Sequence, residues 1–250
     1  MNEIRAVAIY TIRDGIRRKA WFPFAFGLLL GALLIFIQYG VKVQVSAATP
    51  YAENIISSFF FFWVWGALFT TAGLGASAIP IERRSQALLT LPIARWKLIA
   101  GKLIGTQVIS AVILISGYLF SFWIAHRQHL EITWNSVYGL AAALTASFVV
   151  LCLSVPLGVR LPAMVTGTLT IAVLLFNSLN EELIRRTGLE WPRTVHHYFP
   201  WMIPTVAMNN AFFKSNSNID YLTLTGSALI AVLFLSVVTL WTRNSELSRD

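Results

Sequence analysis

The chain has few charged residues. Asp, Glu, Lys and Arg make up 12% of its 250 residues, whereas hydrophobic residues make up 56%; ordinary soluble domains contain roughly 25% charged residues. A transmembrane helix needs about 20 mostly apolar residues, and six runs without Asp, Glu, Lys or Arg are long enough: about 21–41, 54–80, 103–125, 134–159, 161–180 and 221–242. The composition therefore predicts an all-α integral membrane protein with six transmembrane helices. Because proton relays and ion-coupled carriers need charged side chains inside the bilayer, the lack of such residues argues against a proton-coupled carrier.

Cysteine occurs only once, as Cys152 in the fourth run, so no intramolecular disulfide can form. A phosphate-binding GxxxxGK[ST] loop is also missing, because Gly101-Lys102 is followed by Leu103 at the start of an apolar run. No nucleotide and no other cofactor is therefore expected in this chain. The energy for any uphill movement would come from a partner.

The four histidines do not form a metal-binding pattern. His126 and His129 lie three residues apart without a third ligand, and the adjacent His196 and His197 point apart on a helix or a strand. No HExxH motif is present, and the acids and histidines lack the spacing of a catalytic triad. The sequence predicts neither a metal site nor a catalytic residue, and it leaves the role of His196 and His197 open.

The distribution of Lys and Arg predicts the topology, because segments rich in these residues stay in the cytoplasm. With the N-terminus inside, 13 of the 19 Lys and Arg residues fall on the cytoplasmic side and 6 on the external side. Both termini are therefore predicted to be cytoplasmic. The net charge of +8 is explained by this topology, so no nucleic-acid partner is expected. The fourth and fifth runs meet at a short cytoplasmic break, where Pro156 and Pro162 enclose Arg160.

Residues 2–19 are predicted to form an amphipathic helix in the cytoplasmic interface of the bilayer. Ile4, Ala8, Ile12 and Ile16 follow at intervals of four on one face, with Arg13 and Arg17 beside them. Such a helix would anchor and orient the first span.

A small-residue pattern, Gly27-x-x-x-Gly31, lies within the first run. Two glycines at this spacing let another membrane helix approach closely. The pattern predicts packing of the first span against a second copy of the chain.

The charged segment IERRSQALLTLPIARWKLIAGK (81–102) separates the second and third runs. From Glu82 to Leu91 it consists mostly of good helix formers, and Pro92 prevents the helix from continuing. A short helix across the cytoplasmic membrane face is therefore predicted. The cluster Arg95-Trp96-Lys97 would anchor the start of the third span, with the Lys102 side chain extending back towards water.

This segment closely resembles the cytoplasmic loop of ABC-2 type permeases, the membrane subunits of a class of ATP-binding-cassette exporters. The residues that carry the resemblance are Glu82, Leu88-Leu89, Pro92, Arg95 and Gly101-Lys102 at the head of a span. The resemblance extends to the basic N-terminal helix, the six spans and the long external loop before the last span. It implies a single transmembrane permease domain of residues 1–250 in the inner (cytoplasmic) membrane of a bacterium, with an interface helix (1–20), a coupling loop (81–97) and a periplasmic loop (181–220).

The resemblance further implies that residues 82–91 form a coupling helix, which docks on a separate ATPase subunit. The positions expected at this contact are Glu82, Arg83, Arg84, Gln86, Pro92 and Arg95. Ser85-Gln86 departs from the Gly-Thr that is frequent in the family, which affects the details of docking. ATP and Mg²⁺ would be bound by the ATPase, two permeases would work with two ATPases, and the present chain would be a non-catalytic subunit.

The substrate is not identified by the sequence. An aromatic cluster in the outer half of the second run, from Phe59 to Phe62 with Trp63 and Trp65, and the lack of internal charge favour an apolar or amphipathic substrate. The main alternative is a membrane scaffold or assembly factor that does not transport, for example in maturation of a copper enzyme, and that holds a periplasmic partner with residues 181–220. An intramembrane enzyme is disfavoured by the missing charges and metal motifs.

Overall fold

The computed structural model describes residues 2–17, 49–78, 95–127, 135–178 and 225–237, and this part of the chain is helical without strands. The helices are α1 (Asn2–Arg17), α3 (Thr49–Ser77), α6 (Arg95–Arg127), α7 (Asn135–Arg160), α8 (Ala163–Ser178) and a C-terminal helix, Thr225–Val237. The predicted all-α class is confirmed for these residues.

Three helices are long and apolar enough to cross a membrane. These segments are Phe59–Ser77, Trp96–Arg127 and Ser136–Gly158, and they coincide with the second, third and fourth predicted spans. The apolar helices Ala163–Leu175 and Thr225–Val237 fall within the fifth and sixth predicted spans but are shorter. The first predicted span lies outside the described residues, so the count of six spans stays a prediction.

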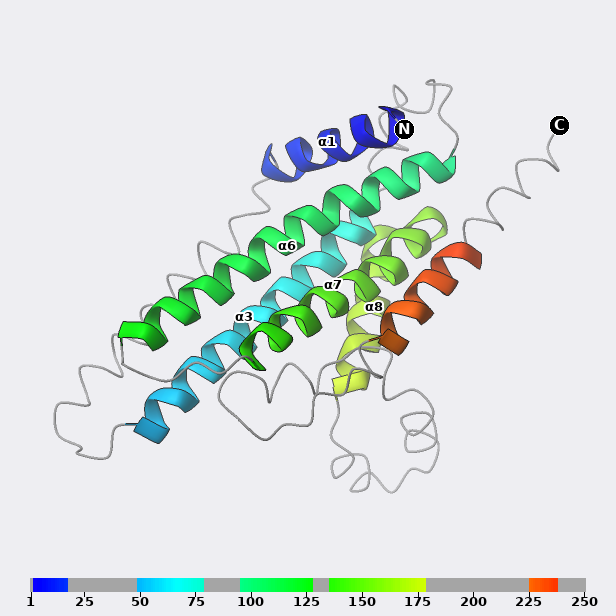
Figure 1. Cartoon of the computed structure of the whole chain (residues 1–250). Coiled ribbons are helices and arrows are strands. Elements are labelled where there is room, and N and C mark those ends of the chain that lie inside the picture. The colour runs from blue at the N-terminus through cyan, green and yellow to red at the C-terminus, as the bar shows by residue number, and fades with distance from the viewer. Residues whose placement is uncertain (1, 18–48, 79–94, 128–134, 179–224, 238–250) are drawn as a thin grey trace, which may run out of the picture.

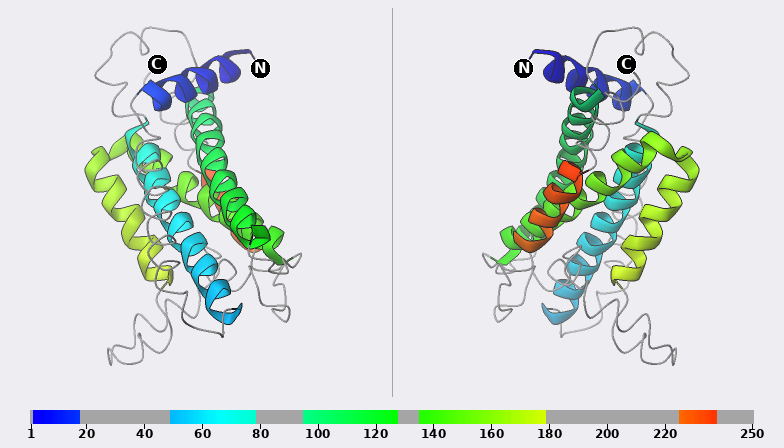
Figure 2. Two further views of the ribbon diagram at one scale, coloured as in Figure 1. Left: turned by 90° about the vertical axis from the view of Figure 1, so that its left-hand side faces the viewer. Right: turned by 90° about the vertical axis from the view of Figure 1, so that its right-hand side faces the viewer.

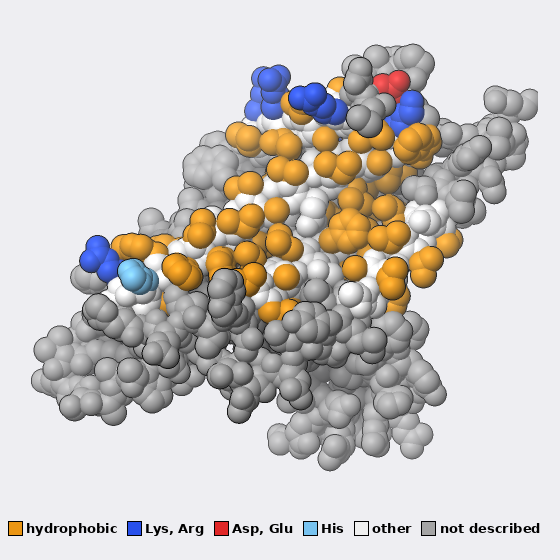
Figure 3. Space-filling model, in the orientation of Figure 1, with side chains coloured by type: hydrophobic (Ala, Val, Ile, Leu, Met, Phe, Trp, Pro, Cys, Tyr) orange, Lys and Arg blue, Asp and Glu red, His pale blue; other side chains and the backbone are white. Residues whose placement is uncertain are grey.

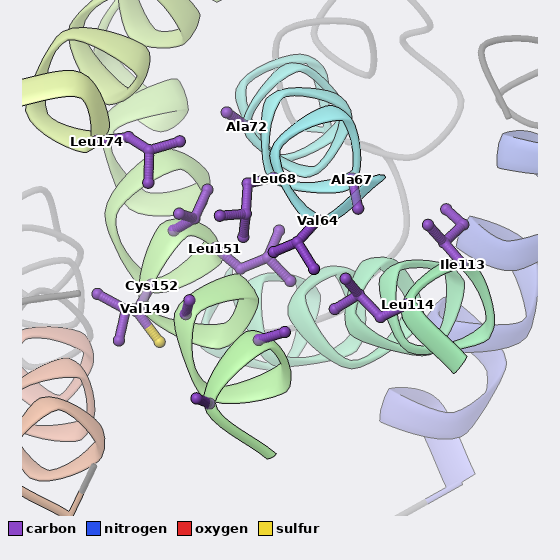
Figure 4. Close-up of a cluster of buried hydrophobic side chains, with 14 of the residues drawn as sticks. Val64, Ala67, Leu68, Ala72, Ile113, Leu114, Val149, Leu151, Cys152 and Leu174 are labelled. Atoms are coloured by element: carbon purple, nitrogen blue, oxygen red, sulfur yellow. The ribbon is translucent and has the colours of Figure 1, made fainter. Parts of the chain in front are cut away.

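Helices α3, α6 and α7 lie side by side, and α8 packs against α3 and α7 (Figure 1). Their shared core contains aliphatic side chains from all four helices, including Leu68, Leu114, Leu151 and Leu174 (Figure 4). Lipid tails are as apolar as these side chains, so close packing rather than removal from water stabilises the contact. Helix α1 lies across the N-terminal end of α6 (Figure 2).

Polar contacts join the three long helices inside this apolar bundle. The Trp63 indole N–H of α3 donates to the backbone carbonyl of Ile113 in α6 at 2.9 Å. Thr71 and Ser110 share a hydrogen bond of 2.8 Å between the same two helices. A third contact, 3.1 Å from the Gln107 amide to the Ser147 hydroxyl, joins α6 to α7. Hydrogen bonds between membrane helices contribute about 0.6 kcal/mol each on average.

The break between α7 and α8 lies at Leu161-Pro162. The Leu161 N–H still donates to the Leu157 carbonyl (2.9 Å), and the Thr166 N–H donates to the Pro162 carbonyl (3.0 Å) at the start of α8. Pro156, which was expected to border this break, instead lies inside α7. Membrane helices tolerate such a proline where neighbouring helices compensate for the missing hydrogen bond, and α7 packs against α3 on both sides of Pro156, at Ser154 and Gly158.

Candidate functional site

The predicted coupling segment lies between the end of α3 and the start of α6. Residues 79–94, which include Glu82, Arg83, Arg84, Gln86 and Pro92, are outside the described part of the chain, and Arg95 is the first residue of α6. The expected roles of these residues therefore stay predictions. The two helix ends that border the segment are described, and each is packed against another helix.

At the C-terminal end of α3, the backbones of α3 and α7 are in close contact. A Cβ atom added to Gly158 of α7 would lie only 2.9 Å from the Ala76 carbonyl oxygen of α3. Next to Ala76, Gly75 of α3 faces Ser154 and Leu151 of α7, about one and two turns before Gly158. Because Gly158 faces a backbone atom, no side-chain rotation can absorb a shift of the last turn of α3 towards α7.

The start of α6 meets α1 in the same manner. A Cβ atom added to Gly105 would lie 2.8 Å from the Ala8 carbonyl oxygen of α1, and one added to Gly101 would lie 2.7 Å from the Val7 side chain. These two glycines form a small-xxx-small pattern, which permits close helix approach. The pattern was visible in the sequence, but the prediction singled out Gly27 and Gly31, which lie outside the described residues.

Helix α1 is confirmed over Asn2–Arg17, and one side of it packs against α6. The residues buried against α6 are Val7, Ala8, Thr11 and Gly15. Of the predicted apolar face, Ala8 is buried in this contact, whereas Ile16 is 60% exposed; Ile9 is 43% exposed. The reason is the shape of α6: a surface with two glycines accepts the small residues of α1 and leaves the larger isoleucines outside.

Two lysines of α6 interact with α1. The Lys97 ammonium lies 2.9 Å from the Glu3 carboxylate. The hydrogen bond from Lys97, followed by its positive charge, holds the pKa of Glu3 below the ordinary value of 4.5. Lys102 was expected to extend towards water, but its side chain is only 2% exposed and its ammonium lies 5.3 Å from the centre of the Tyr10 ring. This expectation was wrong because α1 covers the second turn of α6.

The charged groups gather at one end of the described bundle. Lys and Arg side chains line α1 and the start of α6, whereas Arg127 and His126 mark the opposite end of α6 (Figure 3). Apolar side chains cover the surface between these two ends (Figure 3). The arrangement fits a bundle whose ends lie at the two membrane surfaces.

The aromatic residues of α3 form two groups with different surroundings. Phe59 packs on Phe120 of α6, with ring centres 5.4 Å apart, and Trp63 fills the notch at Gly117. These rings join α3 to α6, so this half of the cluster stabilises the bundle.

The second group lies along another side of α3 and consists of Phe61, Phe62, Trp65 and Phe69. Successive ring centres are 5.6 to 6.0 Å apart, and Phe62 is 70% exposed. Within the described part of the chain, the buried Trp65 indole nitrogen has no hydrogen-bond partner. This row therefore presents an apolar ring surface, with one buried and unused hydrogen-bond donor beneath it.

No group of three metal-ligating side chains occurs among the described residues. His126 is exposed at the end of α6, while His129, His196 and His197 lie outside the described ranges. The loop 181–220 is likewise outside them.

Comparison with known proteins identifies one family. The sequence model described as "ABC-2 family transporter protein" matches residues 82–241, which is more than half of the chain and begins at the predicted coupling segment. No curated protein matches the chain significantly.

Proposed function

Because the chain belongs to the ABC-2 family of transporter proteins, we propose that it is the permease subunit of an exporter for an apolar or amphipathic substrate. In this proposal a separate ATPase subunit binds ATP and Mg²⁺ and supplies the energy, and the present chain has no catalytic role. The observation that carries the proposal is the packing of the two helix ends beside residues 79–94. The family match starts at Glu82, within the same segment.

The proposed mechanism begins with closure of the ATPase, which displaces residues 82–91. Glu82, Arg83, Arg84 and Gln86 would contact the ATPase, while Pro92 and Arg95 would end the docking helix. The displacement would then reach the end of α3 and the start of α6.

At each helix end the displacement would reach a tightly packed contact with a second helix. Gly158 and Ala76 join α7 to α3, and Gly105 and Ala8 join α6 to α1, in both cases through backbone atoms. Close-packed interiors transmit displacement because few voids absorb it. ATP would favour one of two permease states through the different affinities of the ATPase for them.

The substrate class is proposed from the second aromatic row of α3. Phe61, Phe62 and Phe69 offer an apolar surface, and the buried Trp65 indole N–H would donate to an oxygen atom of the substrate once the side chains that cover it move aside. A buried donor without an acceptor is unfavourable by about 1–3 kcal/mol, so a substrate that supplies an acceptor would gain affinity. The row suits an amphipathic molecule better than an ion.

A second copy of the chain is proposed to cover this side of α3. Phe62, Gly66, Phe69 and Gly73 follow at intervals of four, three and four, and a Cβ added at either glycine would have nothing within 4 Å. Rings and glycines that alternate in this way can interlock across a twofold axis. The substrate path would then run between the two permeases.

The remaining topology is proposed as well: six spans in a bacterial inner membrane, with both termini in the cytoplasm. The Lys and Arg side chains at one end of the bundle support this orientation (Figure 3). The N-terminal helix and the start of α6 would lie at the cytoplasmic surface.

The test is co-purification of the tagged full-length protein from its native membrane, followed by mass spectrometry and an ATPase assay. Glu82→Lys, or Arg83→Glu with Arg84→Glu, should remove a co-purifying ATPase while the permease still inserts into the membrane. Arg127→Glu, at the opposite end of α6, is the matched control and should retain it. A wild-type protein that carries no ATPase would overturn the exporter proposal and favour a scaffold for a periplasmic partner.

A further inference from the structure

The side of α1 that faces away from α6 carries arginines and an isoleucine at regular intervals. Arg5, Ile9, Arg13 and Arg17 follow at intervals of four, so they lie along one broad face of the helix. All four side chains are exposed, as is the neighbouring Ile16. The face therefore combines three guanidinium groups with two large aliphatic side chains.

The two lysines of α6 that contact α1 have partners, whereas the three arginines of α1 do not pair with a described carboxylate. Lys97 is paired with Glu3, and Lys102 lies over Tyr10. Arg5, Arg13 and Arg17 have no carboxylate partner in the described part of the chain. Their positive charge is thus not neutralised by any carboxylate of the described ranges.

The opposite side of α1 is fixed on α6. Its small residues contact Gly101 and Gly105, where no additional carbon atom fits. The helix cannot rotate to bury its isoleucines, so Ile9 and Ile16 stay next to the arginines on the outer face.

We propose that this face of α1 binds the headgroups of anionic phospholipids. A guanidinium group matches a phosphodiester with two parallel N–H···O bonds. Helices that lie in the interface place aliphatic residues at the boundary of the acyl chains and basic residues at the headgroups, and the alternation of Arg5, Ile9 and Arg13 meets both requirements. An acidic protein surface would satisfy the arginines but leave the isoleucines without an apolar partner.

This site goes beyond the proposed transport function. It requires only a membrane, which follows from membership of the family, and it depends on neither the substrate nor the ATPase. Since α1 is joined to α6 at Gly105 and Ala8, the bound lipid would also hold the start of α6 at the membrane surface.

The experiment is a lipid titration of the full-length protein in detergent, followed by native mass spectrometry. Phosphatidylglycerol is the probe and phosphatidylcholine, which has a phosphate but no net charge, is the reference lipid. The wild type should bind phosphatidylglycerol more tightly. One basic residue near an anionic membrane surface contributes about 1 kcal/mol, so the preference should fall about fivefold per arginine removed and on the order of a hundredfold in a triple variant.

The variants are Arg5→Gln, Arg13→Gln and Arg17→Gln together, and Arg13→Gln alone in case the triple variant does not fold. Arg127→Gln is the matched control, because Arg127 is an exposed arginine at the other end of α6. Replacement of the three arginines by lysine should keep the charge and lose the two-bond geometry, giving an intermediate preference.

Unchanged preference for phosphatidylglycerol in the triple and single glutamine variants would overturn the proposal. The same loss with Arg127→Gln would also overturn it, because net charge alone would then decide binding. A triple variant that binds the lipid normally but loses its ATPase would show that the face docks a protein instead.

Discussion

Gly158→Ala tests the contact through which α3 is joined to α7. The new methyl carbon would lie 2.9 Å from the Ala76 carbonyl oxygen and 3.6 Å from the Ala76 carbonyl carbon, whereas ordinary contacts of a Cβ atom begin at 3.4 Å. Both neighbours are backbone atoms, so no side-chain rotation relieves the clash. The two helices must separate by about 0.5 Å, and overpacking of this kind costs about 1–3 kcal/mol.

The same substitution also has a favourable part. Alanine is more stable than glycine inside a helix by about 0.5–1 kcal/mol. The net loss of unfolding free energy should therefore be about 1 kcal/mol, which lowers the midpoint of thermal unfolding by about 2–4 °C in a chain of this length.

Cys152 provides the assay. It is the only thiol of the protein and is fully buried in α7, so a thiol-reactive dye reports unfolding during a temperature ramp in detergent. Gly167→Ala in α8 is the control, because a Cβ at Gly167 would lie 3.8 Å from the Ala76 Cβ, an ordinary contact, and only the favourable helix term remains. The reasoning would be refuted if the two variants shifted the midpoint in the same direction.

Two further predictions use side chains with contrasting partners. Trp63→Phe removes the N–H that bonds to Ile113 and should lower the unfolding free energy by about 0.5–1.5 kcal/mol. Trp65→Phe removes a donor without a partner among the described residues and should not lower the unfolding free energy. Equal losses in the thiol assay would contradict this prediction. The pKa of Glu3 is lowered by Lys97, so the carboxylate stabilises the α1–α6 contact above the ordinary pKa of 4.5 and stops doing so as the pH falls through the lowered value. Hydrogen exchange of α1, corrected for intrinsic rates, should be steady from about pH 8 to about pH 5 and rise below, and Glu3→Gln should abolish that rise.

Apolar length and charge distribution were sufficient to predict the helical class and three helices that are long and apolar enough to cross a membrane. A run of about 20 apolar residues without charge has few alternatives to a membrane helix, and α3, α6 and α7 were found in the expected places. The N-terminal helix was predicted from its periodicity and is present over Asn2–Arg17. The family was indicated by the order of residues from Glu82 to Lys102 and is confirmed by the match over residues 82–241.

The packing partners could not be predicted from the same patterns. Periodicity shows that α1 has an apolar face, but the side that meets α6 is decided by Gly101 and Gly105 on the other helix. Lys102 is buried because of that contact, and the residues around Lys102 in the sequence do not predict its burial. Small-residue pairs are frequent in membrane helices, so the relevant pair is recognised only once the neighbouring helix is known.

The backbone contacts at the two helix ends join α3 to α7 and α6 to α1, while α6 also packs along α3 and α7. In the proposed transport cycle two groups of helices, α3 with α7 and α8 and α6 with α1, would move relative to one another, and polar contacts such as Thr71–Ser110 oppose that movement. The Thr71 hydroxyl donates its only proton to the Ala67 carbonyl, so Ser110 must donate to Thr71.

A double-mutant cycle of Thr71→Val and Ser110→Ala, with thermal unfolding as the readout, isolates this bond. Its coupling free energy should be about 0.6 kcal/mol and no more than about 1.7 kcal/mol. Such a bond is weak enough for a difference in ATPase affinity of a few kcal/mol to break it. A coupling energy well above that range would mean that α3 and α6 move as one body, and the division into two groups would then be wrong.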